Sequence, residues 1–458
     1  MDDYDRLYEV YDRFDTEELR AYREFVDLFP PLSSPVALDR WDEATARLAE
    51  RRSEIVAAFD DGERLAEIAA RADRTTAFTA LDLRGKYGRA VNALVLDVDE
   101  TLRSAGDTDN EIPRETLHLL TEFVERGVPL VICTGQTLEN VKGFLVQGLG
   151  NELVHSGDVS VVYEAGAGVF TPGHGADTKR LLYDDLPEDS RGVVDDVRSR
   201  VLRAAPESIR RGCHLQGNEF NVTLKPNHET GGPDAAAVID EGVVHLLDLV
   251  GEAVADRVAV GEVETTAPPA SEAAVRATHY DGDAADGEDD ESLDDPAPGA
   301  AVARAFFADA DPEVAGALAR EGGAVAAAVP DAAADLLGRL DVALYYADAA
   351  ELAVRALDKA QGVAAALDVL GIDDPFVAVV GDSKSDLRAM EWAADRDAGI
   401  AAAPAHASER VLEHVRATDE LVFPPGEAAT LLRTIWALNC LVDDEFEAAG
   451  ADRRTREE

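Results

Sequence analysis

Two aspartates close a buried apolar run in the segment "ALVLDVDETL", Ala93 to Leu102. Apolar residues followed directly by acids are typical of a buried strand that ends at the edge of a sheet. Side chains two residues apart on a strand point the same way, so we expect Asp97 and Asp99 to face one pocket, about 7 Å apart. Two neighbouring carboxylates cost free energy unless a cation or a proton compensates them. The pair indicates a reactive or cation-binding site, although an acidic strand end in solvent would look the same.

Further polar residues stand where other predicted strands end or helices begin. They are Thr134 and Gly135 after "VPLVICT", Lys359 ahead of a later helix, and Asp382, Ser383 and Asp386 in "FVAVVGDSKSD". Each alone has an ordinary explanation as a cap, a turn residue or a solvated lysine. Open parallel sheets bind ligands at the carboxyl ends of their strands, so together they predict one site. Mg²⁺ suits this set, because it prefers oxygen ligands and often bridges carboxylates to phosphate.

The elements that position these residues alternate between strand and helix, which is typical of βαβ units and a parallel sheet. The predicted strands are 92–98, 128–134, 159–170 and the start of 376–386, and the predicted helices are 114–127, 138–150 and a helical region over 350–371. Between these halves, 213–226 alternates like an antiparallel strand pair, and 340–347 reads as another strand. The fold class is therefore α/β, with a Rossmann-like parallel sheet core, an inserted α+β domain and an N-terminal helical extension.

The predicted domains follow from changes in composition and in the predicted secondary structure along the chain. They are a helical extension over 1–88, a core over 89–176 and 351–440, an inserted domain over 177–350, and a tail over 441–458. Within the insertion, residues 264–300 are rich in Pro, Ala and acid and poor in large apolar side chains, so we expect a disordered loop there.

Composition excludes several classes of function. The 458 residues carry 92 acidic against 43 basic side chains, a formal net charge of -49 that is spread along the chain. This resembles proteins of salt-accumulating halophiles, such as halophilic archaea, and it disfavours nucleic acid as a partner. The cysteines Cys133, Cys213 and Cys440 form no CxxC pair, which argues against a disulfide framework and a structural zinc site. With no signal-peptide core and no apolar run long enough to span a membrane, we expect a soluble, cytoplasmic protein.

The order "DVDET", "ICTGQ", Lys359 and "GDSKSD" resembles the four motifs of the haloacid dehalogenase (HAD) superfamily. More narrowly, it is similar to the phosphatases whose cap domain follows the second motif, the group of Cof-type and sucrose-phosphate phosphatases. The resemblance covers about 90–176 and 350–436, covers the insertion more loosely, and does not reach residues 1–88.

The resemblance implies a Mg²⁺-dependent phosphomonoester hydrolase acting on a small phosphate ester. Asp97 would be the nucleophile that forms an aspartyl-phosphate, and Asp99 would protonate the leaving alcohol and then activate water. Thr134, Gly135 and Lys359 would hold the phosphoryl oxygens. Asp97, the backbone carbonyl of Asp99, and Asp382 would bind Mg²⁺, with Asp386 as a ligand or as support for the ligands.

The chain departs from the family pattern in three places. Gln136 stands where an arginine is common, Lys359 is followed by Ala-Gln-Gly where relatives often have the glycine directly after the lysine, and Ser385 replaces the usual asparagine. The substrate class that the resemblance implies is a sugar or polyol phosphate. Polar residues of the inserted domain either contact such a substrate or are ordinary surface groups: Arg210, Arg211, His214, Asn218, Asn221 and Lys225. A phosphomutase of the same superfamily, or an idle phospho-ligand-binding regulatory protein, remains an alternative.

Overall fold

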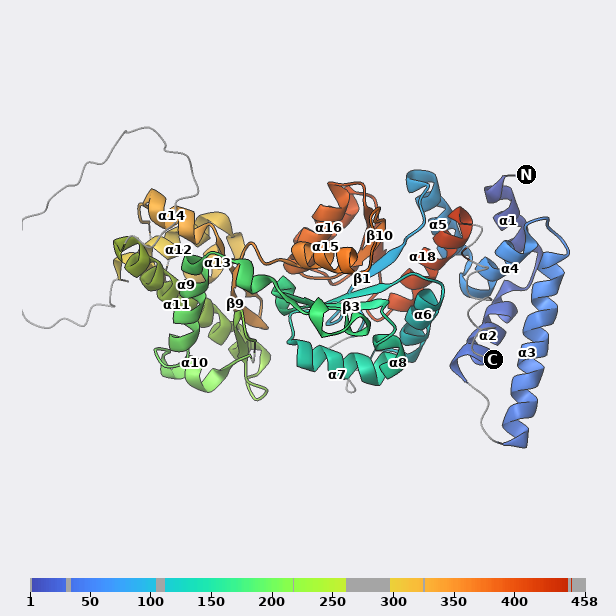
Figure 1. The fold of residues 1–458 in the computed structure, drawn as a ribbon, viewed down its shortest axis with the longest axis horizontal. Coiled ribbons are helices and arrows are strands. Elements are labelled where there is room, and N and C mark those ends of the chain that lie inside the picture. The colour runs from blue at the N-terminus through green and yellow to red at the C-terminus, as the bar shows by residue number, and fades with distance from the viewer. Residues whose placement is uncertain are drawn as a thin grey trace, which may run out of the picture. The chain divides into compact units, whose positions relative to one another are not determined.

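The chain folds into two compact units, which are described separately. The computed structural model describes residues 2–29, 34–103, 112–216, 218–260, 297–323, 326–443 and 446. The first unit combines Met1–Leu182 with Leu357–Glu458, and the second is Tyr183–Ala356 (Figure 1). The second unit is thus inserted between two halves of the first.

The first unit is built on an eight-stranded sheet of order β12-β11-β10-β1-β2-β3-β4-β5. Its strands are β1 (Ala93–Asp97), β2 (Leu130–Cys133), β3 (Val159–Tyr163), β4 (Gly168–Phe170), β5 (Arg180–Leu181), β10 (Val377–Val380), β11 (Gly399–Pro404) and β12 (Leu421–Phe423). Every pairing from β12 to β3 is parallel, whereas β4 and β5 are antiparallel. The predicted α/β class with a parallel core sheet is confirmed.

Helices cover both faces of this sheet (Figure 1). They are α6 (Arg114–Glu125), α7 (Leu138–Leu149), α8 (Asn151–Val154), α15 (Lys359–Val369), α16 (Lys384–Ala394), α17 (Glu409–Ala417) and α18 (Ala428–Val442). The first unit also has the 3-10 turns η1 (Glu164–Gly166), η2 (Pro172–His174) and η3 (Ala176–Thr178), and η4 (Leu182–Asp185) leads from it into the second unit. Ala93 and Val95 of β1 belong to one buried cluster with Val363 of α15 and Met390 of α16. Because strand side chains alternate, Asp97 lies on this same face, toward α15 and α16.

The N-terminal residues form five helices that pack on the sheet domain within the first unit. They are α1 (Asp3–Arg13), α2 (Thr16–Leu28), α3 (Pro35–Val56), α4 (Gly62–Arg71) and α5 (Arg74–Tyr87). The buried Arg71 guanidinium pairs with Glu67 at 2.7 Å and with Glu122 of α6, and it lies 4.1 Å from the ring centroid of Trp436 on α18. A buried ion pair against an aromatic face fixes α4 against α6 and α18, because separating them would leave buried charges without partners.

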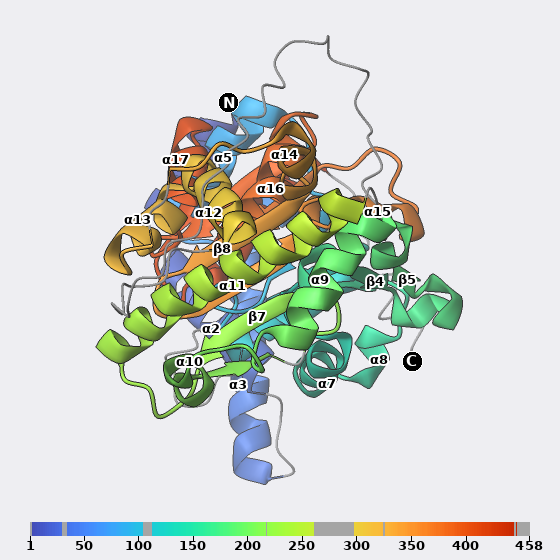
Figure 2. The ribbon, with the colours of Figure 1, turned by 90° about the vertical axis from the view of Figure 1, so that its left-hand side faces the viewer.

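The second unit packs helices on a four-stranded antiparallel sheet of order β6-β7-β9-β8. Its elements are α9 (Glu188–Arg200), α10 (Glu207–Gly212), β6 (Cys213–Leu215), β7 (Val222–Pro226), α11 (Gly232–Val260), α12 (Pro298–Ala310), α13 (Pro312–Arg320), α14 (Asp331–Leu337), β8 (Leu340–Tyr345) and β9 (Ala349–Val354). The long helix α11 contacts β7, β8 and β9 and also packs against α12 and α13 (Figure 2). The strand pair predicted over 213–226 is confirmed.

The helical region predicted over 350–371 is wrong in its first part. Residues Ala349–Val354 form β9, and only Lys359–Val369 are helical. Ala350, Leu352 and Val354 are buried at every second position, which is the period of a β-strand. This strand pairs with β7 on one side and β8 on the other. The alanine and leucine content favoured a helix, but the pairing with β7 and β8 prevails over that propensity.

The loop predicted over 264–300 lies outside the described residues except at its end. There, Pro298 begins α12, with a proline at the position in the first turn that tolerates the missing N–H. The prediction is therefore wrong for residues 298–300.

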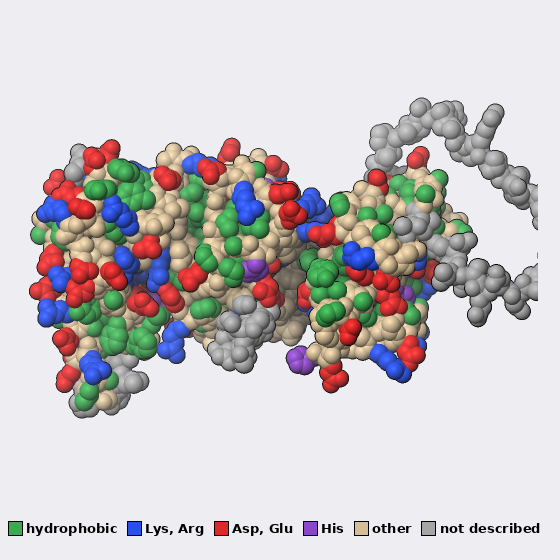
Figure 3. Space-filling view, turned by 180° about the vertical axis from the view of Figure 1, so that it is seen from behind, with side chains coloured by type: hydrophobic (Ala, Val, Ile, Leu, Met, Phe, Trp, Pro, Cys, Tyr) green, Lys and Arg blue, Asp and Glu red, His purple; other side chains and the backbone are tan. Residues whose placement is uncertain are grey.

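Acidic side chains are spread over the visible face of both units (Figure 3). Within the described part of the chain, no helix combines the length and the apolar character that a membrane span requires.

Candidate active site

Lys359 binds two carboxylates that come from the two separate segments of the first unit. Its Nζ lies 2.6 Å from Oδ1 of Asp97 and 2.6 Å from Oδ1 of Asp386. All three side chains are buried, Lys359 and Asp386 to 2% exposure and Asp97 to 7%. Asp97 is the last residue of β1, and Lys359 is the first residue of α15, after the N-cap Asp358 whose side chain accepts from the Gln361 amide. The carboxyl edge of the sheet therefore does bring these predicted residues together.

The cluster holds more negative charge than Lys359 can compensate. Burial opposes the lysine's charge, but the Asp386 and Asp97 carboxylates outweigh it and raise the pKa of Lys359. Burial and the neighbouring charges of Asp386 and Asp382 raise the pKa of Asp97 well above its ordinary value. Burial, and to a smaller extent the negative charge of Asp386, raises the pKa of Asp382 to about 7. Three carboxylates around one ammonium make a site that attracts a further cation or holds a proton.

The acidic cluster fits a divalent metal ion. One carboxylate oxygen each from Asp97, Asp382 and Asp386 lies within 4.8 Å of the others. Thr101 Oγ1 donates to Oδ1 of Asp382 at 3.1 Å and orients it. Both oxygens of Asp386 have protein partners, because Oδ1 meets Lys359 and Oδ2 accepts from the Ser383 hydroxyl at 2.6 Å and from the Ser383 amide at 3.0 Å. An all-oxygen donor set with uncompensated charge is the type that suits Mg²⁺.

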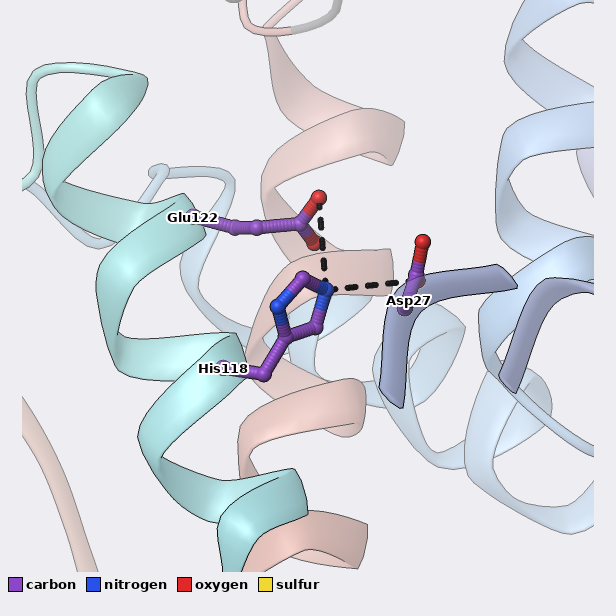
Figure 4. A group of neighbouring side chains, drawn as sticks. All are labelled: Asp27, His118 and Glu122. Atoms are coloured by element: carbon purple, nitrogen blue, oxygen red, sulfur yellow. Dashed lines mark ion pairs between the residues drawn. The ribbon is translucent and has the colours of Figure 1, made fainter. Parts of the chain in front are cut away.

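A second group of metal-ligand types, Asp27, His118 and Glu122, shows the opposite electrostatics (Figure 4). His118 Nε2 lies 3.4 Å from Asp27 and 3.8 Å from Glu122. Arg23 also contacts Asp27 at 2.6 Å and Glu122 at 2.9 Å, and Arg71 pairs with Glu122. Burial alone would raise the pKa of Asp27 and of Glu122, but His118 and Arg23 lower the first and Arg71 lowers the second. Arginines already compensate these acids, so this group is a structural ion-pair network.

Asp99 does not join the cluster of Asp97, Asp382 and Asp386. Its expected place on the face of Asp97 assumed a longer strand, but β1 ends at Asp97 and the chain turns at Glu100, where φ is 57°. Arg103 donates to Oδ1 of Asp99 through Nε at 3.0 Å and Nη2 at 2.7 Å, and Gln136 Nε2 donates to Oδ2 at 2.7 Å. Sequence reasoning missed Arg103. Its position four residues after Asp99, in the same loop, was the available signal.

The loop after β2 presents hydrogen-bonding groups at the same edge. The N-cap of α7 is Thr137, so Thr134 is not a helix cap. The buried Thr134 hydroxyl accepts from the Gln136 amide at 3.0 Å, which leaves its O–H as a donor. Gly135 is exposed, and no described group accepts from its N–H. Thr134 and Gly135 thus offer two donors to an anionic ligand.

A turn of unusual backbone geometry supports this loop from behind. Glu164, Ala165 and Gly166 have φ of 46°, 55° and 108°, in the left-handed region. The Glu164 amide donates to the Gln136 carbonyl and the Ala165 amide to the Thr134 carbonyl, both at 2.9 Å. A Cβ on Gly166 would lie 2.2 Å from the carbonyl oxygen of Asp358, directly before Lys359. The strained turn therefore holds the loop of Thr134 and the start of α15 in register.

The polar residues singled out in the second unit do not form one site. Half-buried Lys225 pairs with Asp348 and exposed Arg211 with Glu207, while His214 Nδ1 lies 3.2 Å from the Asn227 side chain. Asn218 and Asn221 are buried: the Asn218 amide donates to Thr223 Oγ1 at 3.1 Å, and both backbone carbonyls accept from Arg198. Arg210 is an exposed residue of α10. Surface ion pairs and hydrogen bonds within the unit account for most of this set.

Comparisons with known proteins find similarity only among solved structures, since no family model and no curated protein matches. A HAD/COF-like hydrolase from Plasmodium vivax is 15% identical, with 79% of this chain and 99% of that chain covered and a TM-score of 0.42. BT1666 from Bacteroides thetaiotaomicron, a phosphatase of the HAD superfamily, is 14% identical, with coverage of 77% and 96% and a TM-score of 0.39. The subclass IIB sugar phosphatase BT4131 is 15% identical, with coverage of 76% and 100% and a TM-score of 0.40. With identities and scores this low, the assignment of a function rests on the geometry of the site.

Metal binding is predicted to stabilise the protein more at about pH 8 than at about pH 5.5, since Mg²⁺ competes with protons for the carboxylates. The pKa of Asp382, about 7, lies above its unfolded value. The folded state therefore keeps a proton that the unfolded state releases, and the metal-free protein loses stability as pH rises from about 4 to about 7. Above this window, Mg²⁺ at a hundred times its Kd should add about 2.7 kcal/mol to the free energy of unfolding. Thermal unfolding with and without Mg²⁺ measures this.

Asp382→Asn is the matched variant for this prediction. It should raise the midpoint of the metal-free protein at about pH 8, because it removes a carboxylate that its neighbours disfavour, and it should abolish the response to Mg²⁺. An Asp382→Asn protein that Mg²⁺ still stabilises like the wild type would place the metal elsewhere.

Gly381→Ala is predicted to disturb the cluster through Asp386. A Cβ at this position would lie 2.2 Å from Cγ of Asp386, which Lys359 and Ser383 hold in place. Moving Asp386 breaks a buried ion pair, so we expect a loss of up to about 3–5 kcal/mol in the free energy of unfolding. Gly143→Ala is the control, because nothing lies within 4 Å of that position in α7, and alanine there should stabilise the helix by up to about 1 kcal/mol. Equal stability of Gly381→Ala and the wild type in denaturant titrations would show that Asp386 moves without cost.

Proposed function

We propose that this chain is a Mg²⁺-dependent phosphatase of the HAD type, which hydrolyses phosphate monoesters of small metabolites through an aspartyl-phosphate on Asp97. The observation that carries the proposal is the cluster of Asp97, Lys359, Asp382 and Asp386, in which one lysine binds two of three neighbouring carboxylates. Dianionic phosphate needs positive charge at its binding site, and this cluster holds both a fixed ammonium and the ligands for a metal ion.

Asp97 is poised as the nucleophile. Lys359 binds Oδ1, and Oδ2 has no partner among the described residues. Its pKa is raised by burial and by the charges of Asp386 and Asp382, so the metal-free site disfavours the carboxylate that must attack. Asp97 and Asp382 would hold Mg²⁺ directly with Asp386 behind them, and bound Mg²⁺ would stabilise the ionised nucleophile and offset the charge of the phosphoryl oxygens.

The reaction then balances over two displacements. Asp97 Oδ2 attacks phosphorus, the bond from phosphorus to the ester oxygen breaks, and Asp99 gives a proton to the departing alcohol. Water then attacks the aspartyl-phosphate, Asp99 takes its proton, and the phosphorus–Asp97 bond breaks to release inorganic phosphate. The Thr134 hydroxyl, the Gly135 N–H and Lys359 donate to the phosphoryl oxygens during both steps.

A sugar or polyol phosphate is the substrate class to test first, in a panel of phosphate esters at high KCl with Mg²⁺. Release of inorganic phosphate supports hydrolysis. A phosphomutase would instead return the phosphoryl group to a second position of the substrate, and a regulatory phospho-ligand binder would show saturable binding without turnover.

Asp97→Asn is predicted to lose turnover completely while the fold is kept, since an amide cannot form the acyl-phosphate. The variant also removes one disfavoured carboxylate, so its metal-free midpoint at about pH 8 should equal or exceed that of the wild type. Asp374→Asn is the matched control, because this acid of the same unit is 90% exposed at its side chain, and we expect wild-type turnover from it. Near-normal hydrolysis by Asp97→Asn would overturn the proposed function.

Asp99→Ala is predicted to discriminate between leaving groups. Phenolate is a poorer leaving group than p-nitrophenolate and needs a proton more as the ester bond breaks. Acid catalysis is typically worth about 10²–10⁴-fold, so the phosphorylation rate should fall far more for phenyl phosphate than for p-nitrophenyl phosphate. With p-nitrophenyl phosphate, the variant enzyme should also accumulate aspartyl-phosphate, because no residue activates the water that hydrolyses it. Rapid-quench experiments measure both steps, and equal losses without a trapped intermediate would remove Asp99 from proton transfer.

A further inference from the structure

We propose that Arg103 and Gln136 are positioning residues that aim Oδ2 of Asp99 at the loop that binds the phosphoryl group. The inference rests on the proposed function and deepens it. It starts from the two oxygens of Asp99, which have different partners: Arg103 donates twice to Oδ1, at 2.7 and 3.0 Å, and Gln136 donates once to Oδ2, at 2.7 Å.

Asp99 needs such support because the side chain is 42% exposed. A half-exposed aspartate at a loop position has several rotamers of similar free energy, and only some would reach the ester oxygen. Effective proton transfer requires the carboxyl oxygen within hydrogen-bond distance of the leaving group. Residues that select one rotamer therefore raise the rate without touching the substrate.

Arg103 is suited to fix one oxygen. Its side chain is only 11% exposed, and its backbone forms a bridge with that of Asp99. The amides of Leu102 and Arg103 both donate to the Val98 carbonyl at 3.1 Å, so the loop folds back and brings the guanidinium to the carboxylate. A planar guanidinium that gives two N–H groups to one oxygen restricts both the place and the rotation of the carboxylate.

Gln136 determines which way the other oxygen points. Its backbone amide donates to Thr134 Oγ1 at 3.0 Å, and its carbonyl accepts from Glu164 at 2.9 Å, so it belongs to the rigid loop that carries the phosphoryl donors. Its carboxamide contacts Oδ2, and Oδ2 therefore faces that loop. A single hydrogen bond from a neutral amide is weaker than the paired contact of Arg103, so an arriving ester oxygen would displace Gln136 and leave Arg103 in place.

The test compares phenyl phosphate with p-nitrophenyl phosphate, which differ in how much the leaving group needs a proton. Arg103→Ala should lower kcat/KM for phenyl phosphate about 10-fold or more, below the 10²–10⁴-fold ceiling of acid catalysis, and by less than about 3-fold for p-nitrophenyl phosphate. Gln136→Ala should show a smaller loss with the same discrimination, and Arg103→Lys should recover part of the rate. Arg180→Ala is the control: this arginine of the same unit is 48% exposed, and among the described residues it pairs only with Asp368, at 3.8 Å.

A double variant shows whether Arg103 acts through Asp99. In an Asp99→Ala background, Arg103→Ala should cause no further loss, because the group that it positions is gone. A further loss there, or equal losses for the two esters in the single variant, would overturn the proposal. Arg103 would then bind the phosphoryl group or stabilise the fold. If Arg103→Ala fails to fold in thermal scans, Gln136→Ala and Arg103→Lys carry the same comparison. These outcomes are separate from the proposed function. Turnover by Asp97→Asn, or a wild-type protein that releases no phosphate, contradicts the proposed function, whereas equal losses for the two esters in an active enzyme contradict only the role of Arg103.

Discussion

The buried contact of Lys359 with Asp97 and Asp386 is the constraint on which the site depends. It joins the end of β1, the start of α15 and the start of α16 at one point, over a sequence separation of 262 residues between Lys359 and Asp97. Removing an ammonium from water is costly, and the two carboxylates at 2.6 Å offset that cost only because their positions are fixed. The inserted second unit therefore interrupts the chain without interrupting the site.

Glycines make this close arrangement possible. Gly381 leaves room for Asp386 to fold back over the strand end, and Gly166 lets the turn after β3 approach the carbonyl of Asp358. Any side chain at these two positions would push on Asp386 or on the residue before Lys359. The strained turn at 164–166 also holds the loop of Thr134, so the donors to the phosphoryl group and the lysine share one support.

The sequence was sufficient for the parts of the site that follow from strand ends. Asp97, Asp382 and Asp386 were found because parallel strands bring their carboxyl ends to one edge, and Lys359 because it precedes a helix of the same sheet domain. The structure places these four side chains together. Asp99 lies outside this group of three carboxylates, and strand alternation does not determine its orientation, because β1 ends at Asp97 and the chain turns at Glu100.

Tertiary context decided the other differences from the sequence predictions. Alanine-rich residues before Lys359 entered β9 because partner strands were available. Gln136 lies 37 residues from Asp99, so only the folded loops show it as a partner, whereas the spacing of four residues was a local signal for Arg103. The five N-terminal helices were predicted as helices, but their attachment through Arg71 and Trp436 was not, because an ion pair between distant segments leaves no local pattern.

The two acidic clusters contain similar residue types, but they differ in how nearby positive charges compensate the carboxylates. This local charge balance, and not the residue composition, distinguishes the site. His118 and Arg23 lower the pKa of Asp27, and Arg71 lowers the pKa of Glu122. Burial and neighbouring carboxylates instead raise the pKa values of Asp97 and Asp382, and Lys359 binds Asp97 and Asp386. The net charge of -49 opposes the approach of a phosphate dianion to either of the two clusters. In molar salt the screening length falls to about 3 Å, so distant charges lose influence while contacts within the cluster keep theirs. The buried ammonium, together with a divalent ion bound by the neighbouring carboxylates, can then make the electrostatic potential positive within a few ångströms of the site. This short range is sufficient for a phosphoryl group bound in direct contact with these charges.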